Sequence, residues 1–300
     1  MTVQHARPRA TGAPAHTGTT KPSKSAKKPS AGRGDIGLLR QVALRLLVPA
    51  IILLCWFALS RSATSGYFVP GPWESFRTAG TMFLSGDISK GFLGEATFTH
   101  FVPSVLRALV GLLLAVAIGV GVGVVLGVSP VAHALFQPLV HLGRSLPSPA
   151  LLGVFFLLFG IGDSPKIFLI AFSVVWPILF NTIDGVMSVG EIRAQAAAVY
   201  RIPARLVLTH IVLPGASPKI FAGIRTAMSM SLIIMIISEL QKSDNGLGYL
   251  LVSTQRDFNY PGFFAVLIVL ALLGVVLNFI FLQIERRVLA WHRGATAQND

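Results

Sequence analysis

The chain has 300 residues, of which 53% are hydrophobic and only 12% are charged, and its mean hydropathy is +0.70. A soluble domain carries about 25% charged residues, so this composition excludes a soluble globular enzyme. The formal net charge of +13 would suit a nucleic-acid-binding protein, unless the basic residues follow another pattern. The single cysteine, Cys55, excludes a disulfide framework within the chain and a multi-thiolate metal site.

The N-terminal segment is polar and basic. Residues 1–41 are predicted to form a disordered cytoplasmic tail, because their composition offers too little apolar area to offset the entropy of ordering a chain. Residues 42–60 are predicted to be a retained membrane helix, with Arg45 at its cytoplasmic end and a kink at Pro49. Residues 61–100 follow as an external loop.

The segment 101–293 carries most of the apolar sequence. Since about 20 apolar residues span a bilayer, we predict spans over about 104–127, 133–159, 166–186, 220–240 and 261–283. Pro138, Pro147 and Pro149 make the second of these irregular, and residues 241–260 form a polar loop. Residues 294–300 are the C-terminal tail. The predicted fold class is therefore an all-α polytopic membrane helical bundle with about six transmembrane helices.

The basic residues follow this topology. Seventeen of the 25 Lys and Arg residues fall in the N-terminal segment, in 188–225 and after residue 285, whereas five fall in 61–100 and 241–260. The positive-inside rule then places both termini and the loop 188–219 in the cytoplasm. Because the charge follows the membrane topology, nucleic acid is not an expected partner.

Small residues recur every fourth position in the span 104–127. They are Gly111, Ala115, Gly119, Gly123 and Gly127. A stripe of this kind lets a second helix approach closely through backbone packing. We therefore predict a helix-packing face, which carries no information about a transported solute.

The polar segment 188–219 is unusually long for a connection between spans, and long loops tend to be functional. Helix-forming residues over 190–201 and Pro203 at the start of 203–211 predict two short helices, with Leu213-Pro214 ending the second. Such a pair could lie on the membrane surface or dock a cytoplasmic partner.

These residues resemble the permease subunit of bacterial ABC importers, in the nitrate/sulfonate/taurine group. The family's loop pattern of E-A-A, three residues, G and then I-x-L-P reads here Gln195-Ala196-Ala197, Arg201 and Ile211-Val212-Leu213-Pro214. Further matches are Gly246-Leu247-Gly248-Tyr249 and Glu285-Arg286-Arg287, and the resemblance spans about 95–293.

Two positions depart from the family pattern. Gln195 replaces the family's Glu, and Arg201 replaces its Gly. Glycine allows a turn with positive φ at little cost. Arg201 must therefore hold an ordinary conformation or adopt a left-handed one at about 1–2 kcal/mol.

The resemblance implies a type I ABC importer permease in the bacterial inner membrane, acting as the translocation subunit for a small polar or anionic solute of sulfonate, nitrate, bicarbonate or vitamin-precursor type. The implied partners are a cytoplasmic ABC ATPase dimer that receives the loop 188–219, a second permease subunit (in a homodimer or a heterodimer), an extracytoplasmic solute-binding protein and membrane lipid. The chain has no phosphate-binding G-x-x-x-x-G-K-[ST] motif. ATP hydrolysis is thus expected on a separate chain, and no enzymatic activity, cofactor, catalytic residue or metal is predicted.

Polar groups inside spans are costly and often functional. The candidates for a solute pathway are Ser145, Ser148, Asn181, Thr182, Ser231, Ser238 and Glu239. The alternative is that hydroxyl groups bond to their own helix and that Glu239 lies at the external interface near Lys242. Arg107 is expected at the interface, and Arg144 is expected to attract an anion or pair with a carboxylate.

Two other functions stay open at this stage. A secondary transporter would need inverted repeats and ionisable groups near the membrane midplane, and the sequence shows no such repeat. A transport-inactive membrane scaffold would retain the loop without its function, and Arg201 is the reason to consider it.

Overall fold

A computed structural model describes residues 33–62, 67–84, 92–189, 199–241 and 243–290. No strand occurs in these ranges, as expected for an all-α protein. The helices are α1 (Arg33–Ser60), α2 (Pro72–Leu84), α3 (Val102–Val128), α4 (Pro130–Ser145), α5 (Leu152–Phe159), α6 (Ser164–Met187), α8 (Ala204–Val207), α9 (Leu213–Leu240), α10 (Leu247–Arg256) and α11 (Tyr260–Val288). Shorter turns are η2 (Thr97–Phe101), η3 (Ser148–Leu151) and η4 (Leu208–Val212).

The chain divides into two units, Met1–Ile52 and Leu53–Asp300, and the division falls inside α1. Helix α1 begins at Arg33, nine residues before the predicted start of the first span, and Pro49 lies inside it. Of the disordered tail predicted over 1–41, residues 33–41 belong to α1, and residues 1–32 lie outside the described residues, as does the C-terminal tail 294–300.

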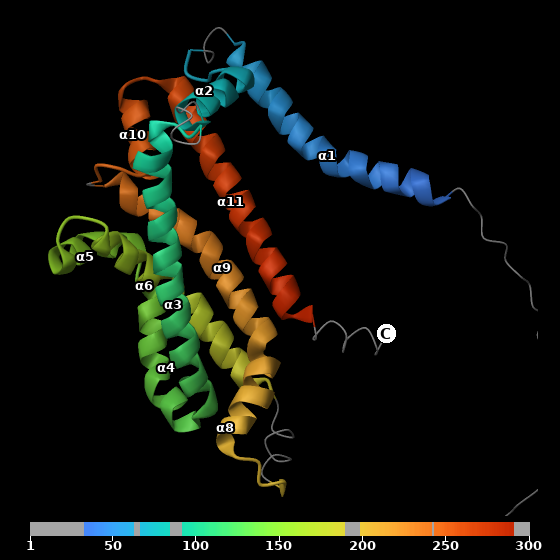
Figure 1. Ribbon diagram of the computed structural model, residues 1–300, viewed down its shortest axis with the longest axis vertical. Coiled ribbons are helices and arrows are strands. Elements are labelled where there is room, and N and C mark those ends of the chain that lie inside the picture. Colours follow the sequence, from blue (N-terminus) through green and yellow to red (C-terminus); the bar gives the residue numbers. More distant parts are fainter. Residues whose placement is uncertain (1–32, 63–66, 85–91, 190–198, 242, 291–300) are drawn as a thin grey trace, which may run out of the picture. The chain divides into compact units, whose positions relative to one another are not determined.

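The second unit is a bundle of long apolar helices (Figure 1). Within the described ranges, four helical stretches are long and apolar enough to cross a membrane: Thr97–Val128, Ser164–Met187, Ala204–Leu240 and Tyr260–Val288. A bent pair, Pro130–Ser145 with Ser148–Phe159, supplies a fifth if it is one span, and Leu47–Ser60 is a shorter apolar helix. The membrane-helical class is therefore as predicted, and the five spans predicted after residue 100 have counterparts in the same order, whereas the span predicted over 42–60 corresponds to the shorter helix Leu47–Ser60.

The span predicted over 133–159 is broken. Helix α4 begins at Pro130, where the Ser129 side chain accepts a hydrogen bond from the amide of Ala132 at 3.3 Å. After Ser145 the axis turns by 85° into η3 and α5. Leu146 is extended at this point (φ −71°, ψ 128°), because the ring of the following Pro147 disfavours a helical conformation.

Our prediction that Leu213-Pro214 ends the second loop helix is wrong. The helical stretch runs without a break from Ala204 to Leu240. The turn η4 precedes the proline, and the amide of Leu213 bonds to the carbonyl of Leu208, five residues earlier. This wider turn moves the backbone ahead of Pro214, whose ring would otherwise collide with a carbonyl and which has no amide to donate.

A π-turn also precedes a proline at the start of α3. There the amide of Val102 bonds to the carbonyl of Thr97 across η2, directly before Pro103. Prolines after π-turns thus begin regular helical spans in this protein, whereas Pro147 breaks one.

Helix α6 lies against the small-residue stripe of α3. A Cβ atom added at Gly119 would come within 2.9 Å of Ile178 Cγ2, and one at Gly123 within 2.7 Å of Thr182 Cβ. Ala115 is fully buried. The absence of larger side chains is therefore what lets the two helices touch along their backbones.

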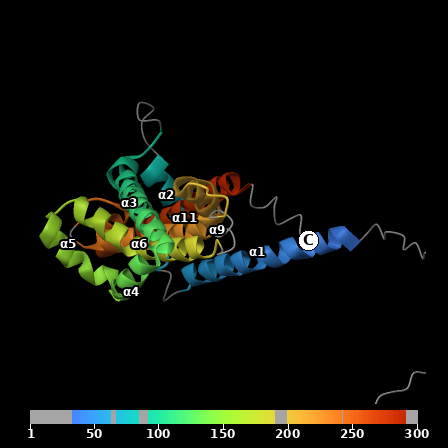
Figure 2. The same ribbon diagram turned by 90° about the horizontal axis from the view of Figure 1, so that it is seen from below.

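The core lies where α6 packs against α3 on one side and against α9 on the other. Leu169, Ile170 and Ile178 of α6 are fully buried, as is Met235 of α9. Figure 2, seen from below, shows α3, α6 and α9 grouped together. Helix α10 lies inside the segment predicted as a polar loop, and it packs on α9 and α11 through Leu247 and Leu250. Helix α2, within the predicted external loop, packs on α11.

Candidate functional site

A buried ion pair joins α3 to α9 near one end of the bundle. Arg107 Nη1 lies 2.6 Å from Glu239 Oε1, and the two side chains are 2% and 0% exposed. A buried ion must be paired and hydrogen-bonded, since taking an unpaired charge out of water costs several kcal/mol. Each residue therefore depends on the other for its place in the apolar bundle.

The Glu239 carboxylate accepts further hydrogen bonds from the neighbouring residues. Ser104 Oγ lies 2.8 Å from both carboxylate oxygens, and the amide of Gly248 donates to Oε2 at 2.9 Å. Ser104 Oγ in turn accepts a hydrogen bond from the amide of Leu247 at 2.7 Å. One carboxylate thus fastens the start of α10 to both α3 and α9.

The glycines before and inside α10 make this contact possible. A Cβ at Gly246, whose φ is +110°, would lie 2.4 Å from Glu239 Cδ. A Cβ at Gly248 would lie 2.7 Å from Glu239 Cβ and 2.7 Å from the carbonyl oxygen of Ile236. The backbone of the Gly-Leu-Gly-Tyr motif therefore packs directly against the Glu239 side chain. The last residue of the motif, Tyr249, stacks on His100 with ring centroids 5.8 Å apart.

The outer edge of the network reaches solvent. Arg107 Nη2 lies 2.6 Å from Asp163 Oδ1, and the Asp163 side chain is 61% exposed. Asp163 occupies the N-cap of α6, and its carbonyl accepts a hydrogen bond from the amide of Ile167 at 3.0 Å, but its side chain makes no cap bond. The carboxylate is turned to Arg107 instead. Arg107 also contacts the side chain of Asn245, and the buried Lys166 donates to Ser243 Oγ at 2.7 Å.

The expectation that Arg107 meets the membrane interface is wrong. A buried carboxylate on α9 and an acidic turn before α6 hold it inside the protein. The sequence does carry a signal for this pair, because Arg107 and Glu239 are ionisable residues within apolar spans, and such residues pair with one another. Lys242, the alternative partner of Glu239, lies outside the described residues.

Most of the candidate pathway residues bond within their own helices. Ser231, Ser238 and Thr182 are buried, and each hydroxyl donates to a carbonyl of its own helix. Asn181 Nδ2 likewise donates to the carbonyl of Pro177 at 2.8 Å. Ser145 is exposed and bonds to the carbonyl of His141, and Ser148 is half-buried in η3. Glu239 belongs to the ionic network.

Arg144 pairs with an aromatic ring. Its guanidinium carbon lies 5.0 Å from the centroid of the Phe180 ring, a cation–π contact. Among the described residues, no group of three His, Cys, Asp or Glu side chains could hold a metal ion.

The opposite end of the bundle carries the loop 188–219. Its two ends meet in one apolar cluster, where Val189 packs with Val186, Ala216 and Ile220, and Ile211 lies against the same cluster. Gln195, Ala196 and Ala197 lie outside the described residues. Leu213 and Pro214 are the first residues of α9. The loop therefore leaves and re-enters the bundle at one place.

Exposed apolar side chains follow in the described part of this loop. Val199 is 78% exposed, Tyr200 80% and Leu206 46%. Arg201 has a φ of +53°, so of the two conformations left open by the sequence it adopts the left-handed one, at about 1–2 kcal/mol. The backbone shape that the family's glycine would allow is thus present with an arginine.

A further ion pair joins α9 to α11 on the way to this end. Arg225 donates to Glu285, and its guanidinium lies 6.0 Å from the Phe281 ring. Lys219 Nζ lies 2.7 Å from Asp184 Oδ2, an exposed pair between α9 and α6.

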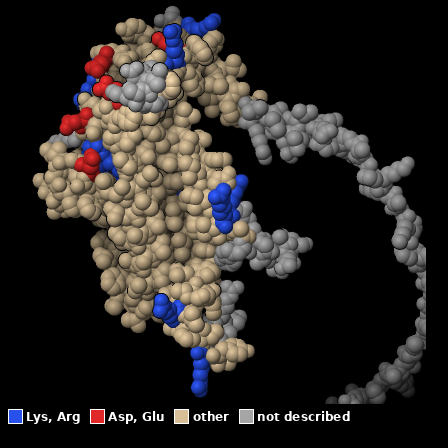
Figure 3. Space-filling view, in the orientation of Figure 1, with Lys and Arg blue, Asp and Glu red and all other residues tan. Residues whose placement is uncertain are grey.

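On the face shown in Figure 3, Asp and Glu lie only in the upper part, beside Lys and Arg, whereas the lower part carries only Lys and Arg.

Comparisons with known proteins agree with this architecture. Residues 96–290 match the family model of the binding-protein-dependent transport system inner membrane component. The taurine transport system permease protein TauC of Escherichia coli (strain K12) is 29% identical over 85% of this chain and 92% of its own. The bicarbonate transport system permease protein CmpB of Synechococcus elongatus is 27% identical over 79% of this chain and 86% of its own.

A solved structure shares the fold. A chain of the MetNI methionine ABC transporter, in an inward-facing conformation, superposes with a TM-score of 0.57 at 18% identity, over 63% of this chain and 94% of that chain. The matched family segment, 96–290, begins just before η2 and ends just after α11, and it contains both the ionic network and the loop. The chain therefore belongs to the binding-protein-dependent transport system inner membrane component family, the permeases of ABC importers.

Proposed function

We propose that this protein is the translocation subunit of an ATP-driven importer, which couples to a separate ATPase through the loop 188–219. The observation that carries the proposal is the exposed apolar surface of Val199, Tyr200 and Leu206 on a loop whose two ends are anchored in the bundle. Water-exposed aromatic and aliphatic side chains in a connection between spans favour a protein partner. Because its ends pack against α6 and α9, the loop can pass a movement of that partner on to these two helices.

The proposed orientation places the loop in the cytoplasm. On the face shown in Figure 3, the lower part carries Lys and Arg without Asp or Glu. The described residues at this end include Arg201, Arg205, Lys219 and Arg225, and such an accumulation of Lys and Arg favours a cytoplasmic face. The ionic network of Arg107 and Glu239 then lies toward the extracytoplasmic end, where a solute-binding protein would deliver the solute.

The proposed solute is a small anion of the sulfonate or bicarbonate type. The support comes from relatives of this chain, whose names specify the transport of taurine, aliphatic sulfonates and bicarbonate. We propose that the pathway forms between two copies of this subunit, since the polar groups of Asn181, Thr182, Ser231 and Ser238 bond to carbonyls of their own helices within a single copy. Ser145 and Ser148 are the other candidates.

Reconstitution tests the proposal. The purified protein is placed in proteoliposomes with its cognate ATPase and binding protein, and uptake of radiolabelled taurine or bicarbonate is measured with and without ATP. We expect uptake only when ATP and both partners are present. Uptake without any ATPase would support a secondary transporter and contradict the proposal.

The docking surface has its own variant and control. Tyr200→Ala removes an aromatic side chain that is 80% exposed on the loop, and Trp73→Ala removes one that is 81% exposed on α2. We expect Tyr200→Ala to weaken co-purification of the ATPase by about tenfold, as for an aromatic interface residue, and Trp73→Ala to leave it unchanged. Equal retention of the ATPase by both variants would exclude Tyr200 from the docking surface.

A further inference from the structure

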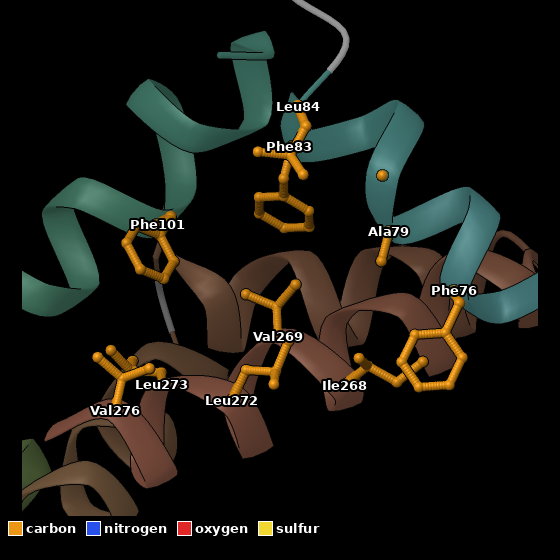
Figure 4. Close-up of a pocket in the computed structure, with 11 residues that line it drawn as sticks. Phe76, Ala79, Phe83, Leu84, Phe101, Ile268, Val269, Leu272, Leu273 and Val276 are labelled. Atoms are coloured by element: carbon orange, nitrogen blue, oxygen red, sulfur yellow. The ribbon is translucent and has the colours of Figure 1, made fainter. Parts of the chain in front are cut away.

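An apolar groove lies between α2 and α11. Its volume is about 380 Å³, and Figure 4 shows side chains of both helices pointing into one space. The lining includes Phe76, Phe83 and Leu84 of α2, Phe101 of η2, and Leu272 and Val276 of α11. All of these side chains end in carbon, so the groove offers water no hydrogen-bond partner.

The groove opens at membrane depth. Leu272 and Val276 are 55% and 51% exposed on α11, a span whose most apolar window has a mean hydropathy of 3.0. Leu272 lies twelve residues after the start of α11, which is about 18 Å along the helix axis. A bilayer core is about 30 Å thick, so this part of α11 lies in the hydrocarbon region, where lipid tails are the surrounding solvent.

One rim of the groove carries a cation. Arg77 on α2 is exposed, and it lies three residues before Gly80 and seven before Leu84, both of which line the groove. This spacing puts Arg77 on the side of the helix nearest these two residues. Among the described residues Arg77 has no ion-pair partner.

The character of α2 fits the membrane interface. Its groove side is apolar, while Trp73 and Glu74 are exposed. Amphipathic helices with tryptophan and arginine lie in the headgroup layer, and arginine there attracts anionic lipid headgroups. A phospholipid would satisfy both features at once, with its tail in the groove and its phosphate near the guanidinium.

We propose that the groove between α2 and α11 is a binding site for one acyl chain of an anionic phospholipid, whose headgroup pairs with Arg77. The site is a fixed part of the fold, because Phe83 is buried and packs with Leu273 in the main core cluster. It requires no transport activity, so it stands or falls independently of the proposed function.

The experiment uses the full chain in vesicles that contain phosphatidylglycerol with a photoactivatable acyl chain. After irradiation, labelled peptides are located by mass spectrometry. We expect the label to concentrate on residues 72–84 and 268–276 rather than to spread over every exposed span. Uniform labelling along α3 and α11 would overturn the proposal. An unlabelled α2 would also overturn it, because a protein segment rather than a lipid would then fill the groove.

A pair of glycine variants supplies the matched control. A Cβ at Gly80 meets no atom within 4 Å, and the same is true at Gly121 on α3. Gly80→Leu therefore adds an apolar side chain whose Cβ meets no atom, at a position that lines the groove, and we expect it to lower labelling of α2 by about tenfold. Gly121→Leu makes the same change elsewhere and is expected to leave the labelling of α2 unchanged. Equal effects of the two variants would overturn the site.

The headgroup is tested separately. Arg77→Gln keeps the groove and removes the cation. We expect this variant to label equally with phosphatidylglycerol and phosphatidylcholine probes, whereas the wild type prefers phosphatidylglycerol. An unchanged preference in Arg77→Gln would overturn the pairing of Arg77 with the headgroup.

Discussion

The guanidinium of Arg107 and the carboxylate of Glu239, 132 residues apart in the chain, meet at 2.6 Å with side chains that are almost fully buried. Ser104 and the amide of Gly248 complete the carboxylate's hydrogen bonds. The pair therefore fixes α3, α9 and the start of α10 against one another at one end of the bundle.

Breaking this pair should be far more costly than breaking the exposed pair at the other end. We expect Glu239→Ala to lower the free energy of unfolding by about 3–5 kcal/mol, because it leaves Arg107 buried with only the exposed Asp163 as counter-ion. The measurement is thermal unfolding in detergent micelles.

The control for this prediction is Lys219→Ala. The side chains of Lys219 and Asp184 are 42% and 70% exposed, so removal of their ion pair should cost less than about 1 kcal/mol. The double variant Arg107→Met/Glu239→Leu should recover much of the loss of Glu239→Ala, since it leaves no unpaired charge. Equal unfolding temperatures for Glu239→Ala and Lys219→Ala would contradict the assignment.

Alanine substitutions at Gly246 and Gly248 can distinguish the cost of steric crowding from the cost of backbone strain. Gly248→Ala puts a Cβ 2.7 Å from Glu239 Cβ, and we expect a loss of about 1–3 kcal/mol from overpacking. Gly160→Ala is the comparison, since Gly160 has a φ of +77° but no atom within 4 Å of an added Cβ. It should lose only the strain of a backbone conformation (φ +77°, ψ −170°) that is nearly confined to glycine, about 1–3 kcal/mol.

Gly246→Ala should be the most damaging of the three. It combines a φ of +110° with a contact of 2.4 Å to Glu239 Cδ. Unfolding temperatures of the three variants give the order. If Gly160→Ala is as destabilised as Gly246→Ala, then backbone conformation rather than the Glu239 contact explains the motif.

Close packing of α3 on α6 gives a prediction of its own. Gly119→Val should destabilise the bundle by about 1–3 kcal/mol, because an added Cβ lies 2.9 Å from Ile178 Cγ2. Gly121→Val, two residues away on the same helix with nothing within 4 Å, should have little effect. Limited proteolysis of the two variants in detergent provides the readout, and equal resistance would argue against tight contact along the stripe.

The left-handed Arg201 makes a ranked prediction for the proposed coupling loop. Glycine and asparagine tolerate a φ near +53°, whereas a β-branched residue does not. We expect Arg201→Gly and Arg201→Asn to bind the ATPase at least as well as the wild type, and Arg201→Val to bind about tenfold more weakly. Affinity measured by co-purification in titrated detergent extracts checks this order. Stronger binding by Arg201→Val would show that the left-handed turn is not the bound conformation.

The sequence by itself determined the class of protein and the order of its spans. Hydropathy and the low charge content identify membrane helices because a bilayer accepts only long apolar segments with satisfied backbones. The stripe of Gly111, Ala115, Gly119, Gly123 and Gly127 identifies a packing face for the same kind of reason, since small side chains act through local spacing.

The sequence predicted an irregular helix around Pro147, as the structure has, but wrongly predicted that Leu213-Pro214 ends a helix. Pro147 breaks a span, whereas Pro214 begins one after a π-turn. Both follow a leucine in the chain, so the preceding residue does not distinguish them. The backbone does, since it forms a π-turn before Pro214 and is extended before Pro147.

Only the tertiary structure decided which polar groups inside the spans meet. Ser231, Ser238 and Thr182 resemble pathway residues in the sequence, yet each bonds to a carbonyl of its own helix. Arg107 and Glu239 lie near span ends in the sequence, yet they meet inside the bundle. A buried charge takes its partner from whichever helix lies beside it, and that neighbour is set by the packing of α3, α6 and α9 rather than by distance along the chain.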